Sequence, residues 1–256
     1  MKGIRFLLCL CFLQGCALQS YLASQVDFLL EMRLQSHLDL YYKQKKMLAQ
    51  DIDLWLGKQK IYVPEARDLL VSIDPLKPQP IQSKIERFLT LYKRSAHEFN
   101  QLLCKYLSQL DSNQQQHFFG KQVDDNDELK KQIAKMNLEK LTERVEFFIG
   151  PIAEGQQSIL KSFLPYWQKR SRDRLERRLV LQTELKRILT QAEKNKEELL
   201  NLAFRKYVDS SFEDPSQLVS FLESLASTLT LEQTNHLLDR KTQALKLLNS
   251  FNQSTF

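Results

Sequence analysis

The stretch IQSKIERFLTLYKRSAHEFNQLLCKYLSQLDSNQ, residues 81–114, decides the fold class of this chain. Its apolar side chains recur every three, four or seven residues, which draws one stripe along a helix. They are Ile81, Ile85, Phe88, Tyr92, Phe99, Leu102 and Tyr106. The stretch ends in LDSNQ, in which Asp111 and Gln114 have the spacing of a capping box at a helix start. It therefore predicts one long amphipathic helix and the beginning of another.

The rest of the chain repeats this helical pattern. A second stripe consists of Leu129, Ile133, Met136, Leu141, Val145 and Phe148, and a long, charged stripe runs from about Tyr166 to Tyr207. After residue 15 the glycines are Gly57, Gly120, Gly150 and Gly155, and this scarcity of breakers favours long helices. No alternating strand pattern of useful length occurs. We expect an all-α bundle of about seven to nine helices.

Four segments predict breaks between helices. DPLKPQP (74–80) carries three prolines, and Gly150-Pro151 ends another apolar stretch. QVDDNDE (122–128) is acidic, with helix caps available from Asp124 to Asp127. DSSFEDPS (209–216) separates the last two helices. We predict one helical domain, 16–256, with candidate sub-division points near 74–80 and 209–216.

The N-terminus has the parts of an export signal. Lys2 and Arg5 precede a short apolar run that is too short to span a membrane. The run ends in Leu13-Gln14-Gly15-Cys16, which resembles the bacterial lipobox, with Leu13 and Gly15 as recognition positions and Gln14 in place of the usual small residue. The resemblance implies cleavage after residue 15 and lipidation of Cys16. The alternatives are an ordinary signal peptide or a buried apolar strand.

Lipidation implies a cellular location. A cysteine with several acyl chains is held firmly in a membrane, since each buried methylene contributes about 0.8 kcal/mol. Ala17 follows Cys16, where an Asp tends to retain such lipoproteins at the inner membrane. The resemblance therefore implies the outer membrane, with the protein facing the periplasm. In such a mature chain Cys104 is the one free thiol, and we expect it to be a small buried side chain.

The net charge of the chain favours some classes of binding partner over others. The formal net charge of +6 falls to +4 when Lys2 and Arg5 are removed with the signal. This mild excess suits anionic lipid heads or wall polymers and is too weak to indicate nucleic acid. The densest basic run is KRSRDRLERR (169–178), in which Arg170, Arg174, Arg177 and Arg178 cluster near one side of a helix. It is either a solvated face with pairs such as Arg172–Glu176 and Asp173–Arg177, or a site for anionic polymers.

One local pattern recurs four times, as an apolar residue followed after three positions by Gln. It reads LYYKQ (40–44), LDSNQ (110–114), IAEGQ (152–156) and LTLEQ (229–233). Capping boxes are predicted for LDSNQ and LTLEQ, whereas Tyr41 and Ala153 make the other two weaker. We expect the preceding apolar residue to pack against the helix start. The spacings of 70, 42 and 77 residues exclude a regular solenoid.

The four Gln-ended helix starts resemble elements of two protein families. The pattern is similar to the LTxxQ element of the Spy and CpxP periplasmic proteins, which are helical ATP-independent chaperones or stress modulators. The chain also resembles a family of uncharacterised proteobacterial outer-membrane lipoproteins, which share an aromatic-rich L-x-x-x-Q start, a Trp and a helix-opening Pro. Leu40, Gln44, Trp55 and Pro64 match those places, as do FFIGPIAEGQ (147–156) and the late LTLEQ; Leu56-Gly57 departs from an expected His-Arg.

The sequence offers no recognisable catalytic, metal or cofactor site. The four histidines, His37, His97, His117 and His236, lack metal-ligand spacing, and no phosphate loop or nucleophile elbow occurs. The aromatic residues Trp55, Trp167, Phe147, Phe148, Phe118 and Phe119 are expected mostly in the core.

Three functions are therefore open. The first is a lipid-anchored, non-catalytic structural or interaction role with envelope proteins or anionic envelope polymers as partners. The second is a membrane-tethered Spy-like chaperone or stress modulator, and the third is an envelope hydrolase.

Overall fold

The protein is all-helical. The computed structural model describes residues 26–75, 81–191, 194–211 and 214–254 of the 256-residue chain, and these ranges contain helices and no strand. The α-helices are α3 (Val26–Leu38), α4 (Tyr42–Gln59), α5 (Val63–Ser72), α6 (Ile81–Leu107), α7 (Ser112–Ala134), α8 (Leu138–Ile149), α9 (Gln157–Thr190), α10 (Lys196–Ser210), α11 (Ser216–Ala226) and α12 (Leu231–Gln253). The predicted all-α multi-helix bundle is confirmed.

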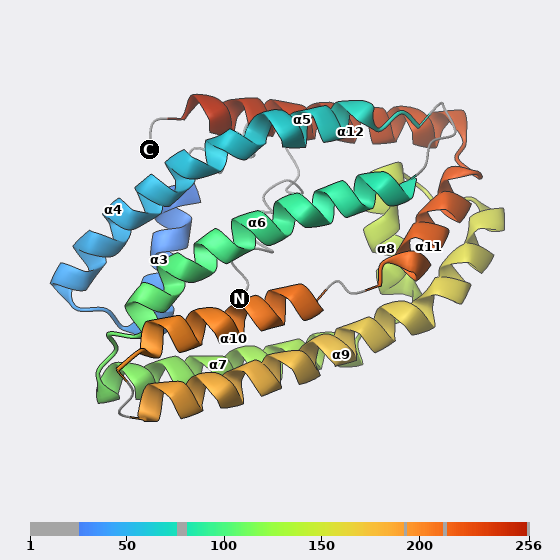
Figure 1. The fold of residues 1–256 in the computed structure, drawn as a ribbon. Helices are drawn as coiled ribbons and strands as arrows, with labels where there is room; N and C mark the ends of the chain where they lie inside the picture. Colours follow the sequence, from blue (N-terminus) through green and yellow to red (C-terminus); the bar gives the residue numbers. More distant parts are fainter. Residues whose placement is uncertain (1–25, 76–80, 192–193, 212–213, 255–256) are drawn as a thin grey trace.

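The helices form an elongated body (Figure 1). α4 and α5 join through the 3-10 turn η1 (Lys60–Tyr62), and α5 packs against α12 along one long edge. α7 and α9 pack together along the opposite edge, and the packed pair α6 and α10 lies between the edges. α3 lies at one end, and α8 and α11 lie at the other. α4 and α5 are continuous through η1, so they count as one rod. Counted in this way, the described residues form nine helical rods, which lies within the predicted range of seven to nine.

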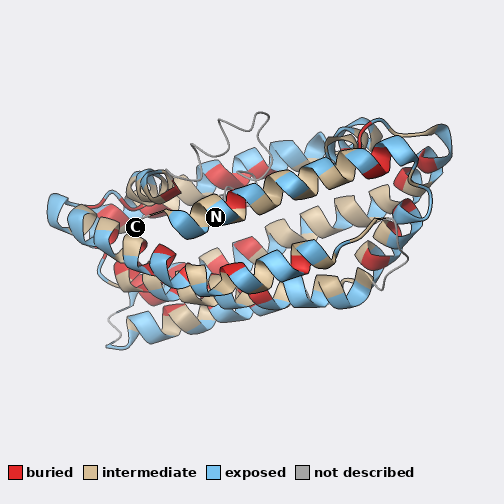
Figure 2. Cartoon of the chain, turned by 90° about the horizontal axis from the view of Figure 1, so that it is seen from above, coloured by how far each residue is buried: buried red, intermediate tan, exposed pale blue. Residues whose placement is uncertain are grey.

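Two apolar cores hold this body together, and Figure 2 shows buried residues toward both of its ends. The first core is built by α3, α4, α7, α10 and the C-terminal parts of α6 and α9. The second is built by α8, α11 and the N-terminal part of α9. Cys104 belongs to the first core and is fully buried, as predicted, and this burial raises the pKa of its thiol to about 12.

The four Gln-ended helix starts come together in two pairs. In the first pair, Gln114 at the start of α7 donates from Nε2 to Gln44 Oε1 of α4 at 2.8 Å and to the Asp39 carbonyl at 2.9 Å. Each Gln also accepts a hydrogen bond from its own cap residue: Tyr41 N to Gln44 Oε1 at 2.9 Å, and Asp111 N to Gln114 Oε1 at 3.2 Å. These contacts join two helix turns separated by 70 residues in sequence.

The second pair repeats this arrangement beside the second core. Gln156 in the 3-10 turn η2 (Glu154–Gln156) and Gln233 of α12 donate to each other at 2.9 Å in both directions. Gln233 also donates to the Pro151 carbonyl at 2.6 Å, and Gln156 donates to the Thr228 carbonyl at 3.0 Å. Gln114, Gln156 and Gln233 are each at most 2% exposed. We call these two pairs the glutamine junctions.

The structure confirms the predicted capping boxes and the predicted difference between the stronger and the weaker helix starts. Asp111 accepts from Gln114 N at 2.9 Å and Thr230 accepts from Gln233 N at 3.2 Å, so both predicted capping boxes are confirmed. Ala153 has no side-chain acceptor, so its start keeps only the reverse bond from Ala153 N to Gln156 Oε1 at 3.0 Å. The preceding apolar residues pack as expected: Leu40 and Leu110 in the first core, and Ile152 and Leu229 against the second.

Three predicted boundaries are confirmed. α6 begins after the proline-rich segment 74–80, and α11 begins at the end of segment 209–216. This segment follows α10, so it precedes the last two helices, α11 and α12, and does not lie between them. Gly150 ends α8 with a φ of 80°, a conformation that favours glycine.

Two expectations about boundaries are wrong. Segment 122–128 lies inside α7, because the side chains of Asp125 and Asn126 have partners on neighbouring helices and so do not compete for the backbone. The second apolar stripe belongs to two helices, since Asn137 caps α8 by accepting from Lys140 N at 2.9 Å. The long charged stripe likewise covers α9 and α10.

The glutamine junctions predict a coupled loss of stability. Gln156→Leu leaves Gln233 without its partner, and an unsatisfied buried amide costs about 1–3 kcal/mol. We expect each of Gln156→Leu and Gln233→Leu to lower the free energy of unfolding by about 2 kcal/mol, and the double variant to lose less than the sum. Urea unfolding followed by circular dichroism measures all three. The exposed neighbour Gln157→Leu is the control; additive losses would contradict the pairing.

Candidate functional site

The predicted lipidation site lies outside the described residues. This applies to Cys16 and to the signal-recognition positions Leu13 and Gly15, since the described chain begins at Val26. Lipidation therefore stays a prediction. No helix among the described residues combines the length and apolarity needed to cross a bilayer.

The predicted arginine cluster is placed on α9, but it does not form one open basic surface. Arg178 is only 6% exposed and lies 3.4 Å from Asp125 Oδ2. Arg170 donates from Nη2 to the Ser211 carbonyl at 2.7 Å. Burial lowers the pKa of Arg174 below its usual value. The Nε of Arg177 is buried and has no hydrogen-bond partner among the described residues.

This placement corrects the solvated-face interpretation of the run. Among the described residues, the predicted pairs Arg172–Glu176 and Asp173–Arg177 do not form, and Lys169 instead lies 3.9 Å from Asp173. The reason is that α9 packs against α7, α10 and α11, so this part of the helix faces neighbours on several sides. Arg178 has an internal carboxylate partner and is therefore not available to an external anion.

Asp125 of α7 is the centre of a charged cluster that joins three helices. Its carboxylate lies 3.2 Å from Arg33 Nη2 and 3.3 Å from His37 Nε2, both on α3, and 3.4 Å from Arg178 Nη2 on α9. Beside it, Asn126 Nδ2 donates to Gln182 Oε1 on α9 at 2.7 Å. We call Asp125, Arg33, His37 and Arg178 the Asp125 cluster. The sequence alone does not reveal this cluster, because the pairing of distant helices decides which charges meet.

The cluster is arranged to hold charge inside the protein. Burial and the nearby Arg33 guanidinium lower the pKa of His37, although Asp125 acts in the opposite direction. Burial alone would raise the pKa of Asp125, but its positive neighbours, including Arg33 and His37, leave that pKa below the usual value. Both carboxylate oxygens of Asp125 have internal partners. The geometry therefore suits an ionic link between helices better than proton transfer to a substrate.

Part of the exposed apolar surface follows one rod, which sequence patterns alone did not mark. Met47, Leu54 and Ile61 lie seven residues apart along α4 and η1 and are 46%, 65% and 68% exposed. A heptad spacing keeps them near one side of the rod. We call these three residues the α4 stripe. Lys46 and Lys58, also exposed, lie within four residues of it in sequence and add positive charge to this helix.

The predicted core aromatics are mostly inside. Trp55 and Phe118 are buried in the first core, and Phe119 packs against it. Trp167 packs against the second core, and Arg144 lies over its ring at 4.9 Å. Phe147 is partly buried beneath Arg240, while Phe148 is 37% exposed. The three residues of the α4 stripe are thus aliphatic, whereas most of these aromatic side chains pack against the two cores.

Within the described ranges no group of three or more His, Cys, Asp or Glu side chains is placed to hold a metal ion. Comparison of the chain with protein-family models, with curated proteins and with solved structures finds no match.

The Asp125 cluster predicts that loss of the Asp125 carboxylate strongly lowers the free energy of unfolding. Asp125→Asn leaves the buried guanidinium of Arg178 without a counter-charge, and breaking a buried ion pair from one side costs about 3–5 kcal/mol. Because Asp125 is slightly exposed, we expect a loss of about 3 kcal/mol in the free energy of unfolding, measured by urea denaturation at pH 7. Asp127→Asn, two residues away and exposed, is the control. A loss under about 1 kcal/mol would show that the ionic link contributes little.

Proposed function

We propose that this chain is a lipid-anchored helical lipoprotein of the bacterial envelope, facing the periplasm from the outer membrane. Its role is structural or interactive and not catalytic. The observation that supports this most is the pairing of all four Gln-ended starts. These starts carry the resemblance to envelope lipoproteins and to the LTxxQ proteins, and in this fold they are the residues that join distant helix ends.

The remaining support comes from the sequence. The lipobox-like Leu13-Gln14-Gly15-Cys16 favours a membrane anchor, and Ala17 favours the outer membrane. The mild positive charge favours anionic lipid heads or wall polymers as neighbours. Of the predicted arginines, Arg178 is committed to Asp125, so a polymer-binding surface would have to use other cations.

The anchor predicts a change in location. Cys16→Ala removes the only sulfur that the proposed lipid could use, and we expect the protein to leave the membrane fraction and to lose the mass of its acyl chains. Fractionation of cells and intact-mass spectrometry measure this. Cys104→Ala, which removes the buried thiol, is the matched control and should stay membrane-bound. Unchanged membrane fractionation of Cys16→Ala would reject the lipoprotein proposal.

A tethered, ATP-independent chaperone is the second candidate, and the α4 stripe favours it. Chaperones of this kind need exposed apolar area together with charge that attracts unfolded clients. Met47, Leu54 and Ile61 supply the apolar area, and Lys46 and Lys58 supply positive charge. In this proposal the anchor confines the stripe to the periplasm.

The chaperone candidate predicts suppression of aggregation. A lipid-free form starting at residue 17 should suppress light scattering of a reduced, unfolding client at equimolar ratio, and Met47→Ser/Leu54→Ser/Ile61→Ser should lose most of this effect. The control triple variant, Val123→Ser/Val180→Ser/Leu202→Ser, removes equally exposed apolar side chains from three other helices. Equal activity of both variants, or none in the wild type, would dismiss the stripe as a client surface.

A further inference from the structure

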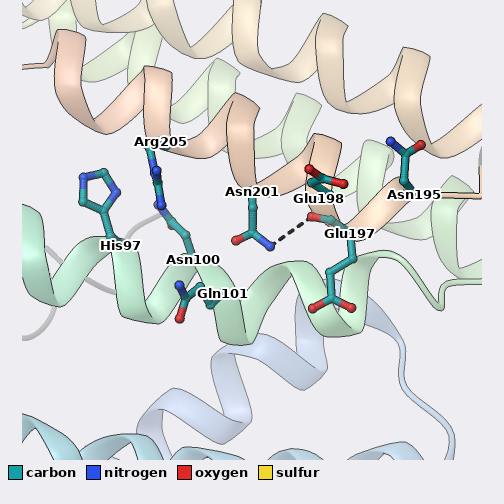
Figure 3. Close-up of a pocket in the computed structure, with 8 residues that line it drawn as sticks. All are labelled: His97, Asn100, Gln101, Asn195, Glu197, Glu198, Asn201 and Arg205. Carbon is teal, nitrogen blue, oxygen red and sulfur yellow. Dashed lines mark hydrogen bonds between the residues drawn. The ribbon is translucent and has the colours of Figure 1, made fainter.

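A polar pocket lies between α6 and α10 and uses no residue of the Asp125 cluster, the glutamine junctions or the α4 stripe (Figure 3). Its volume is about 500 Å³. The lining residues with the relevant polar groups are His97 and Asn100 on α6, and Glu197, Glu198, Asn201 and Arg205 on α10. Because α6 and α10 pack closely along their length, this pocket has a rigid frame on both sides.

The pocket has the guanidinium of Arg205 at one end and the carboxylates of Glu197 and Glu198 at the other. Figure 3 shows Arg205 and His97 at one end, Glu197 and Glu198 at the other, and Asn201 between them. Across the described residues, none of Arg205, Glu197 and Glu198 forms an ion pair. His97 is turned to Asp209, with 3.2 Å between Nε2 and Oδ1, so Arg205 is the group at this end that faces a ligand with its positive charge. A ligand with one charge would therefore meet attraction at one end and repulsion at the other.

The wall between the charged ends carries amides. Asn100 is only 7% exposed, and its Nδ2 is buried with no hydrogen-bond partner in the described part of the chain. A buried donor without a partner costs free energy, and a turn of this amide would bring it to an acceptor in the pocket. Asn201 donates from Nδ2 to the Glu197 carbonyl at 3.0 Å, which fixes its amide in the middle of the pocket. Side-chain amides in this position suit a ligand that has amide groups of its own.

The length of the pocket sets the length of the ligand. Glu198 and Arg205 are seven residues apart on α10, about 10 Å along the helix axis. Three extended residues of a peptide span about the same distance. We propose that this pocket binds a short zwitterionic peptide, with its carboxylate at Arg205, its ammonium at Glu198 and its amides at Asn100 and Asn201. The inference is independent of the proposed function, since it uses neither the anchor nor the α4 stripe.

Triglycine is the probe for this proposal. Titration of the full-length chain by calorimetry should give saturable binding, and Arg205→Gln and Glu198→Gln should each weaken it about tenfold. In ¹⁵N-labelled protein the Asn100 side-chain amide resonance should shift on binding. Lys206→Gln and Glu223→Gln remove the same charges at exposed positions outside the pocket and should bind like wild type. Absence of saturable binding to the folded wild type would overturn the proposal.

Modified ligands test which end of the pocket binds the carboxylate and which end binds the ammonium. N-acetyltriglycine lacks the ammonium, so its weak binding should be insensitive to Glu198→Gln; triglycinamide lacks the carboxylate and should be insensitive to Arg205→Gln. 6-Aminohexanoate keeps both charges without peptide amides and should bind more weakly than triglycine. Triglycine binding that neither substitution changes, or 6-aminohexanoate binding as tightly as triglycine, would overturn the assignment of charges or amides. Thermal unfolding of every variant confirms that a loss of binding is not a loss of fold.

Discussion

A buried glutamine must satisfy both an acceptor and two donor hydrogens, and this constraint organises the fold. At the start of a helix its oxygen accepts from the cap residue's amide, which leaves the NH₂ group without a partner in its own turn. Here the NH₂ groups of Gln114, Gln156 and Gln233 find partners in a second, distant helix start. The glutamine side chain that caps one helix therefore also fixes the position of a second helix start. Each of the two cores is closed by one such pair.

The order of elements around these pairs describes an internal repeat. In each half, a helix leads into a Gln-ended start and a second helix, and the same arrangement recurs three helices later. α3–α4 and α6–α7 meet at the first junction, while α8–α9 and α11–α12 meet at the second. The 70 and 77 residues between paired starts are thus the meaningful spacings, and the 42 residues between the second and third motif separate the halves. A search for a constant period could not find this arrangement.

What the sequence predicted and what it missed have separate physical reasons. Periodicity and capping chemistry are local, so the long helix α6, the caps at Asp111 and Thr230, the end of α8 at Gly150 and the burial of Cys104 were all predictable. The acidic segment of α7 looked like a break because isolated acidic residues favour helix ends. Its helical state depends on Arg33, 92 residues earlier in the chain, and on Arg178, 53 residues later. Likewise the pocket between α6 and α10 consists of unremarkable polar residues until the two helices are placed side by side.

α9 belongs to both cores, with Leu160 in the second and Leu181, Leu185, Ile188 and Leu189 in the first. As a 34-residue helix it is about 50 Å long, and Pro165, which lies between the residues of the two cores, removes one backbone hydrogen bond from it. The two cores are therefore joined by a helix and not by a loop, and Pro165 is the point at which that helix bends most easily. A change of bend at Pro165 would tilt the second core, with α8 and α11, relative to the first core.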